Sequence, residues 1–231
     1  MPKHGPPGVY LCGMALLIES VPLWHFETNA YVIAPDRGGP AVVVDAPPDP
    51  EGVGDLLAKF DLTPVAILVT HGHVDHVGGV DGIASETVRA YMHPLDIDMA
   101  RHPRLQLQAL LGSAFPMGDE ELVSTQFNDL EHEETLTIAE IDFGVLHTPG
   151  HTPGHCCFYL EQEAVLFSGD QLFKRGIGRT DLPGGSYDDL MRSMADYVLP
   201  LPSETMVLPG HGPSTTIGAE RDLNPFLQEL Q

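Results

Sequence analysis

The chain has 231 residues, of which 42% are hydrophobic, and this composition fits a globular protein and excludes collagen-like and largely disordered classes. Its 33 acidic residues against 11 basic ones give a formal net charge of −22. This charge argues against nucleic acid and anionic membranes as partners, because both attract basic surfaces.

Three cysteines without a CxxC pair argue against a disulfide framework. The longest apolar run near the start, Met14 to Ile18, is too short to span a membrane, and no convincing signal peptide precedes it. We therefore expect a cytoplasmic protein. We also expect a loose leader over residues 1–13 and a single domain over residues 14–231, with Met14 as an alternative start.

The first third of the chain alternates β-like and helical patterns. Helix 51–60 is predicted because Val53, Leu56, Leu57 and Phe60 recur on one face. A short helix is expected to open at Gly78-Gly79-Val80. Strands are predicted over Met14–Val21, Thr28–Ala34, Ala41–Val44, Val65–Val69 and Val88–His93.

Residues 94–118 contain three prolines and no clean period, so they form either a core helix or a flap over a pocket. From Glu134 the pattern becomes β-like, with a turn predicted at Asp142-Phe143-Gly144. A helix is predicted over Tyr187–Val198, and a terminal helix over residues 218–230 is interrupted near Pro225. The remaining predicted strands are Thr135–Ile141, Val145–His147, Cys156–Leu160, Val165–Phe167 and Met206–Leu208. Periodicity alone indicates an α/β chain.

Four side chains that can bind metal, His71, His73, Asp75 and His76, occur within six residues directly after strand Val65–Val69. Neutral imidazole and carboxylate together suit zinc, iron(II) or manganese. In extended chain His71 and His73 project to the same side, while Asp75 and His76 can turn toward a second position. A single histidine here would fit a solvated polar turn, but the crowding of four such groups indicates a loop that serves two ions.

Three further candidates, His151, Asp170 and His211, each lie in or next to a glycine-containing turn directly after a β-like run. In open α/β sheets the ligand sites lie at the carboxyl ends of the strands. Residues far apart in the sequence are therefore expected to share one site.

The HxHxDH loop and the later His, Asp and His resemble the metallo-β-lactamase superfamily, and the resemblance covers essentially residues 14–231. It implies an αββα sandwich of two mixed β-sheets flanked by helices, with the site at one edge. It also implies two divalent metal ions, with zinc expected first and iron or manganese as alternatives. The implied ligands are His71, His73 and His151 for one ion, Asp75, His76 and His211 for the other, and Asp170 between them.

The chemistry that such a site permits is hydrolysis. Two ions roughly 3.5–4 Å apart clamp a bridging water, lower its pKa and polarise the carbonyl that the resulting hydroxide attacks. Asp75 and Asp170 are expected to act catalytically as well as to bind metal, since they offset part of the positive charge.

Several tracts are similar to the short, single-domain bacterial glyoxalase II group, the hydroxyacylglutathione hydrolases. They are Phe167 to Arg175, Gly178-Arg179-Thr180-Asp181, Pro209 to Pro213 and Asn224-Pro225-Phe226-Leu227. This resemblance implies a thioesterase that cleaves a small-molecule 2-hydroxyacyl thioester, such as S-lactoylglutathione, to the hydroxy acid and free thiol. In the larger enzymes of the group a basic residue in the position of Arg179 contacts glutathione, and a tyrosine stands where this chain has Asp181.

Lys174, Arg175 and Arg179 place three of the eleven cations within six residues beside the expected site. We predict that Lys174 and Arg179 contact the substrate, with Arg179 holding a carboxylate of the thiol carrier. The alternative is a basic surface turn that compensates neighbouring acids.

Other enzyme classes use nearly the same residues. Persulfide dioxygenases also resemble this chain, including the Gly-Arg-Thr-Asp tract, and bind one iron through positions that match His71, His151 and Asp170. Lactonases, β-lactamases and a non-catalytic metal-binding protein are further alternatives. The oligomeric state cannot be read from the sequence.

Overall fold

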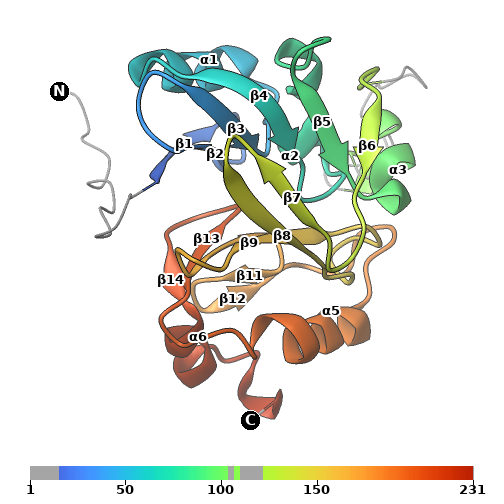
Figure 1. The fold of residues 1–231 in the computed structure, drawn as a ribbon. Coiled ribbons are helices and arrows are strands. Elements are labelled where there is room, and N and C mark those ends of the chain that lie inside the picture. The colour runs from blue at the N-terminus through green and yellow to red at the C-terminus, as the bar shows by residue number, and fades with distance from the viewer. Residues whose placement is uncertain (1–15, 104–106, 110–121, 231) are drawn as a thin grey trace, which may run out of the picture.

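The computed structural model describes residues 16–103, 107–109 and 122–230. Two six-stranded β-sheets pack face to face, with α1 and α3 on the outer side of one sheet and α5 and α6 on the outer side of the other (Figure 1). Both sheets contain parallel and antiparallel pairs. The αββα sandwich expected from the sequence is confirmed.

The first sheet has the strand order β1-β2-β3-β4-β5-β6. The strands pair antiparallel from β1 to β3 and parallel from β3 to β6, so that β3 to β6 end at the same edge. The bounds are β1 Leu17–Leu23, β2 Thr28–Ala34, β3 Pro40–Val44, β4 Thr63–Leu68, β5 Arg89–Met92 and β6 Phe127–Asp129.

The second sheet has the order β14-β13-β10-β9-β8-β7, in which β10 and β13 pair in parallel. Its bounds are β7 Thr135–Ile138, β8 Ile141–His147, β9 Cys156–Leu160, β10 Val165–Gly169, β13 Met206–Pro209 and β14 Thr215–Thr216. A separate short hairpin consists of β11 Leu172–Phe173 and β12 Gly176–Ile177.

The helices are short, and three of them begin at a side chain that caps the first turn, namely Asp49, Ser186 and Thr216. The Asp49 carboxylate accepts from the Gly52 N–H at 3.0 Å, and Pro50 takes the first helical position of α1, where no N–H is needed. Among the described residues the helices are α1 Pro50–Lys59, α2 Val74–Val77, α3 Ile97–Arg101, α5 Tyr187–Ser193 and α6 Ile217–Leu223, with 3-10 helices at Val80–Gly82, Pro94–Asp96 and Gln228–Leu230 and a π-helical turn at Met194–Val198. Within the part of the chain that the structure covers, no helix is long and apolar enough to cross a membrane.

Three apolar layers hold the sandwich together. The central layer lies between the two sheets, where Ile33 and Val44 of the first sheet belong to the same cluster as Phe143, Phe158 and Phe167 of the second. A second layer joins the first sheet to α1 and α3, and a third joins the second sheet to α5 and α6. The large buried side chains therefore fix the two sheets against each other and hold their strand ends at one edge.

The predicted turn at Asp142-Phe143-Gly144 is wrong. The chain turns at Ala139 and Glu140, whose φ angles are 51° and 64°, and Phe143 is fully buried within β8. Two positive φ angles match the twist of a two-residue hairpin, but Ala and Glu are not the residues that usually adopt them.

Some other predicted elements have different bounds in the structure. The short helix expected at Gly78-Gly79-Val80 is present as the 3-10 helix Val80–Gly82, and a further short helix, α2, begins earlier, at Val74 inside the histidine loop. The first strand runs to Leu23 and not to Val21. Of residues 94–118, Ala100 of α3 packs into the core, while most of the segment after Pro103 lies outside the described residues, as do the leader 1–13 and Met14.

Candidate metal centre

The seven candidate side chains come from loops that follow strands of both sheets. His71 and His73 follow β4, and Asp75 and His76 lie in α2. His151 lies between β8 and β9, Asp170 follows β10, and His211 follows β13. All seven converge on one edge of the sandwich, and all except the partly exposed His211 are buried.

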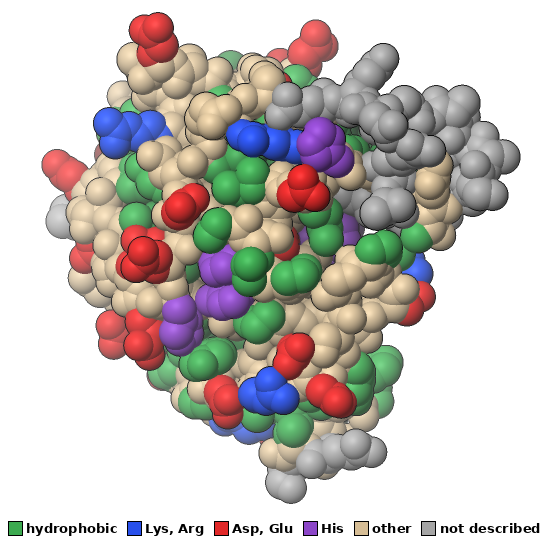
Figure 2. Space-filling view, turned by 90° about the vertical axis from the view of Figure 1, so that its right-hand side faces the viewer, with side chains coloured by type: hydrophobic (Ala, Val, Ile, Leu, Met, Phe, Trp, Pro, Cys, Tyr) green, Lys and Arg blue, Asp and Glu red, His purple; other side chains and the backbone are tan. Residues whose placement is uncertain are grey.

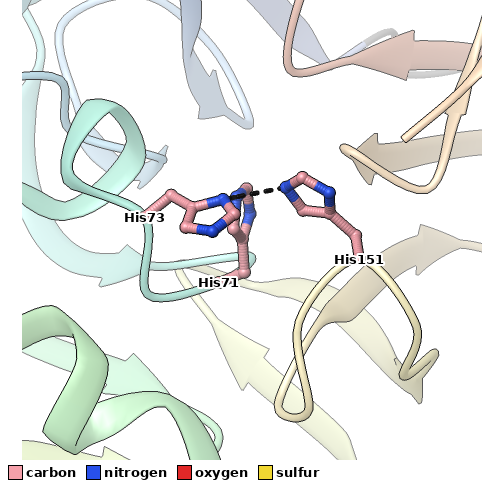
Figure 3. Close-up of side chains that lie close together, drawn as sticks. All are labelled: His71, His73 and His151. Carbon is pink, nitrogen blue, oxygen red and sulfur yellow. Dashed lines mark hydrogen bonds between the residues drawn. The ribbon is translucent and has the colours of Figure 1, made fainter. Parts of the chain in front are cut away.

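A first group consists of His71, His73 and His151. The Nδ1 atom of His73 lies 3.0 Å from Nε2 of His71 and 2.8 Å from Nε2 of His151. Figure 3 shows these three rings directed toward one another, two from the histidine loop and one from the opposite loop. The three nitrogens are close enough to share one cation.

A second group consists of Asp75, His76 and His211. Asp75 Oδ2 lies 3.4 Å from His76 Nε2 and 3.2 Å from His211 Nε2, and the two nitrogens are 3.4 Å apart. A further close set, His71, His76 and Asp170, joins this group to the first.

Asp170 lies between the groups. Its Oδ1 is 3.4 Å from His76 Nε2, while its Oδ2 is 3.5 Å from His151 Nε2 and 3.6 Å from His211 Nε2. The Oδ1 atom is buried and has no hydrogen-bond partner among the described residues. One carboxylate therefore contacts both groups with an acceptor left unsatisfied.

The outer nitrogens of four histidines contact acceptors, which assigns the proton to the outer side of each ring. His71 Nδ1 donates to Thr70 Oγ1, because that hydroxyl gives its own proton to Asp45. The other three pairs are His76 Nδ1 with Asp45 Oδ2 at 2.7 Å, His151 Nδ1 with the Arg179 carbonyl at 2.7 Å and His211 Nδ1 with the Phe26 carbonyl at 3.0 Å. Each of these rings consequently directs its other nitrogen into the site.

The charge of the site also favours a cation. Burial opposes a charge on His76, yet the carboxylates of Asp75, Asp45 and Asp170 raise its pKa to about 10. Burial is the main reason that the pKa values of His71 and His73 lie well below the usual value. The ring nitrogens converge, one carboxylate oxygen has no partner, and the carboxylates favour a positive charge. These features fit divalent metal ions of the kind that imidazole and carboxylate bind.

Asp45 and Asp96 are buried carboxylates that support the site and that the sequence did not single out. Asp45 holds His76 and the Thr70 N–H, the latter at 2.8 Å. Asp96 accepts from Gly72 N at 2.9 Å, Thr152 Oγ1 at 2.6 Å and Gly154 N at 2.6 Å. Asp96 therefore joins the loop of His71 and His73 to the loop of His151, about eighty residues away.

Two further groups fix Asp170. His155 Nε2 accepts the Asp170 N–H at 3.1 Å, and the other ring nitrogen contacts Thr148. Gly210 packs so closely that a β-carbon there would overlap Asp170 Oδ1 and His76 Cε1. The backbone glycine of the His211 turn is thus required by the approach of the carboxylate.

The predicted substrate contacts lie outside this buried cluster. Lys174 is exposed in the turn between β11 and β12, and none of the contacts found among the described residues joins it to the cluster. Arg179 is also exposed and pairs with Asp181. Arg175, the third cation of the segment, instead binds the buried carboxylate of Glu220 in α6, so it is a structural anchor.

One face of the molecule carries dispersed charge. On the face shown in Figure 2, the acidic side chains of the described residues are spread among hydrophobic and uncharged ones. This arrangement accords with a net charge of −22 and with a solvated surface.

Comparison with known proteins gives consistent matches. The pattern of the metallo-beta-lactamase superfamily matches residues 23–211, a range that contains all seven clustered residues. Hydroxyacylglutathione hydrolase GloC of Haemophilus influenzae is 36% identical over 91% of this chain and 97% of its own length. The crystal structure of BLEG-1 B3 metallo-beta-lactamase is 41% identical with a TM-score of 0.83 over 92% of this chain and 100% of that chain. The structure of TTHA1623 in a di-iron-bound form is 38% identical with a TM-score of 0.77 over 90% and 100% of the respective chains.

Proposed function

Since the chain belongs to the metallo-β-lactamase superfamily, we propose that it is a dinuclear metal-dependent hydrolase that cleaves a 2-hydroxyacyl thioester such as S-lactoylglutathione. The observation that carries the proposal is the pair of three-residue groups that share Asp170. A closed structural zinc site needs only four ligands, whereas this edge gathers seven.

His71, His73 and His151 would hold one ion and Asp75, His76 and His211 the other, with Asp170 contacting both. Bound ions supply Lewis-acid activation of water and of the substrate carbonyl. Zinc is the first expectation, and iron stays an alternative that the di-iron relative supports.

The protein's own contribution is to orient the inward nitrogen of each of four histidine rings toward the site. The outer ring nitrogens donate to Thr70, Asp45 and the carbonyls of Arg179 and Phe26, and these hydrogen bonds fix the ring orientations before any ligand binds. Asp75 and Asp170 add negative charge, which lowers the repulsion between two neighbouring cations.

The thioester as substrate is supported by the hydroxyacylglutathione hydrolase relative. Lys174 and Arg179 are the proposed contacts for the thiol carrier. The partner of the protein is then a small molecule. The expected cytoplasmic location accords with this substrate and stays a prediction.

The test is the initial rate of S-D-lactoylglutathione hydrolysis by protein of measured metal content. We expect kcat/KM of about 10⁴ M⁻¹s⁻¹ or above. Negligible turnover by fully metallated protein would reject the thioesterase.

A β-lactam is the second candidate substrate, because the BLEG-1 relative is described as a B3 metallo-beta-lactamase. Hydrolysis of a chromogenic cephalosporin by the same preparation separates the two. We expect its kcat/KM to be at least tenfold below that for the thioester, and the opposite order would favour the lactamase.

A further inference from the structure

We propose that Asp181 is a specificity-determining residue that occupies Arg179 and so disfavours thiol carriers with a carboxylate at this position. The inference rests on the proposed function in one respect, that Arg179 borders the substrate site. It adds that the favoured carrier is uncharged where it faces Arg179.

Arg179 is fixed beside the cluster by its main chain. Its carbonyl accepts the Nδ1 proton of His151 at 2.7 Å, and a β-carbon on the preceding Gly178 would overlap the Asp170 carbonyl. The main chain at Arg179 therefore lies against the loops that carry His151 and Asp170.

The guanidinium of Arg179 is already bound by a carboxylate. Nε donates to Asp181 Oδ1 at 2.7 Å, and Nη2 donates to Asp181 Oδ2 at 2.8 Å. This is the two-pronged geometry with which arginine recognises carboxylates in ligands. A substrate carboxylate would have to displace Asp181 or approach a pair whose net charge is zero.

The other guanidinium of the segment offers no replacement. The Arg175 side chain pairs with Glu220, whose carboxylate is fully buried and also accepts from Thr215 Oγ1 and Asn224 Nδ2. Lys174 takes part in none of the ion pairs found among the described residues, but it is a point charge without the planar fork of arginine. Within the described part of this segment, both groups that could bind a carboxylate by two parallel hydrogen bonds are thus committed to acids of the chain itself.

The Arg179–Asp181 pair is open to water, with side-chain exposures of 48% and 70%. Exposed pairs of this kind contribute little to stability. Asp181 should therefore tune affinity by a small factor without affecting the fold. Removal of its charge should free Arg179 for a carboxylate of the ligand.

The experiment measures binding of S-methylglutathione, a thioether that cannot be hydrolysed, to the metal-loaded protein by calorimetry. Its analogue with the glycine carboxylate converted to an amide is the ligand control. Asp189→Asn is the matched protein control, because Asp189 forms a similarly exposed pair with Arg192 and its removal changes the net charge equally.

We expect Asp181→Asn to bind the acid form about three- to fivefold more tightly than the native protein, as one exposed charge pair would allow. Binding of the amide form should not change, and Asp189→Asn should match the native protein with both ligands. The double variant Arg179→Gln, Asp181→Asn should lose the gain, which would show that the gain acts through Arg179.

Equal binding of the acid form by the native protein and Asp181→Asn, including no measurable binding by either, overturns the inference. A gain of the same size for the amide form overturns it too. Neither result depends on turnover, so a failure of the thioesterase proposal is recognised separately, in the hydrolysis assay.

Discussion

The buried cluster and the exposed segment 174–181 lie side by side but are built in opposite ways. In the cluster, most ring nitrogens and carboxylate oxygens have a fixed partner, and the side chains are withdrawn from water. In segment 174–181, Lys174 extends into solvent, and the side chain of Arg179 pairs with an exposed neighbour, Asp181. From this difference we expect the proposed metal chemistry to be rigidly set, and substrate preference to rest on weak contacts that single substitutions can alter.

The largest effect is expected from Asp170→Ala, which removes the carboxylate common to both groups. We expect kcat/KM to fall by about three orders of magnitude or more, because several kcal/mol of transition-state stabilisation are lost. Metal content should fall as well. Asp196→Ala, at an exposed position of the π-helical turn, is the control, and comparable activity in the two variants would contradict the assignment.

Asp96→Asn tests whether the cluster depends on the link between its loops. Both carboxylate oxygens of Asp96 accept hydrogen bonds from N–H or O–H donors. In the asparagine variant an NH₂ group replaces one of these oxygens and faces those donors. We expect metal affinity, measured by competition with a chelator, to fall about tenfold or more.

Asp81→Asn is the matched control for this variant. Asp81 also accepts from two N–H groups and two hydroxyls, those of Ser124 and Thr125, but away from the cluster. Equal loss of metal affinity in both variants would show that Asp96 acts through general stability and not through the site.

Metal binding should release protons, and affinity should rise with pH. The pKa of His76 is raised to about 10 and that of His211 is also raised, so the metal-free protein holds at least one proton at pH 7.5 that a metal ion must displace. His71, His73 and His151 have lowered pKa values and release none.

Each proton released corresponds to about a tenfold gain in affinity per pH unit. Calorimetry of cobalt(II) binding in buffers of different ionisation enthalpy counts these protons. A count of zero would mean that the carboxylates do not hold a proton on His76.

The smallest effect is expected from Lys174→Gln. Its charge is exposed, so KM for S-D-lactoylglutathione should rise by only about two- to threefold, with kcat unchanged. Lys59→Gln removes the same charge from α1 and is the control. A large loss of kcat in Lys174→Gln would place the lysine at the reacting atoms and would remove the contrast between segment 174–181 and the cluster.

The seven clustered residues were accessible from the sequence because they stand at the ends of β-like runs, beside glycine turns. The αββα sandwich was expected from the resemblance to the metallo-β-lactamase superfamily, since periodicity alone indicated only an α/β chain. His151, Asp170 and His211 stand directly after or beside β-like runs, and strand ends of one sandwich converge. The burial of apolar strand residues holds the two sheets against each other whatever the conformation of the loops.

The supporting residues were not accessible in the same way. Asp45, Asp96 and His155 are single polar residues whose partners lie up to 58 residues away, and no spacing marks them. Asp45 has a φ of 59°, an uncommon backbone for aspartate that only coordinates reveal. The turn at Ala139 and Glu140 was missed because tertiary packing of Phe143 overrides the turn preference of Asp142 and Gly144.

The commitment of Arg175 to Glu220 was hidden for a related reason. The two residues are 45 positions apart, and the acidity of the chain offers many candidate partners for each cation. The excess of acidic residues predicts that cations will form ion pairs. It does not predict which cations bind acids of the chain and are therefore not free to bind a substrate.

The most direct test of the central claim is the number of metal ions bound per chain after chelator-stripped protein is reloaded and dialysed. The two groups that share Asp170 predict saturation at two ions per chain, with loss of one ion in His211→Ala. Saturation at one ion in the native chain would contradict the dinuclear hydrolase and favour a single-iron enzyme of the persulfide dioxygenase type.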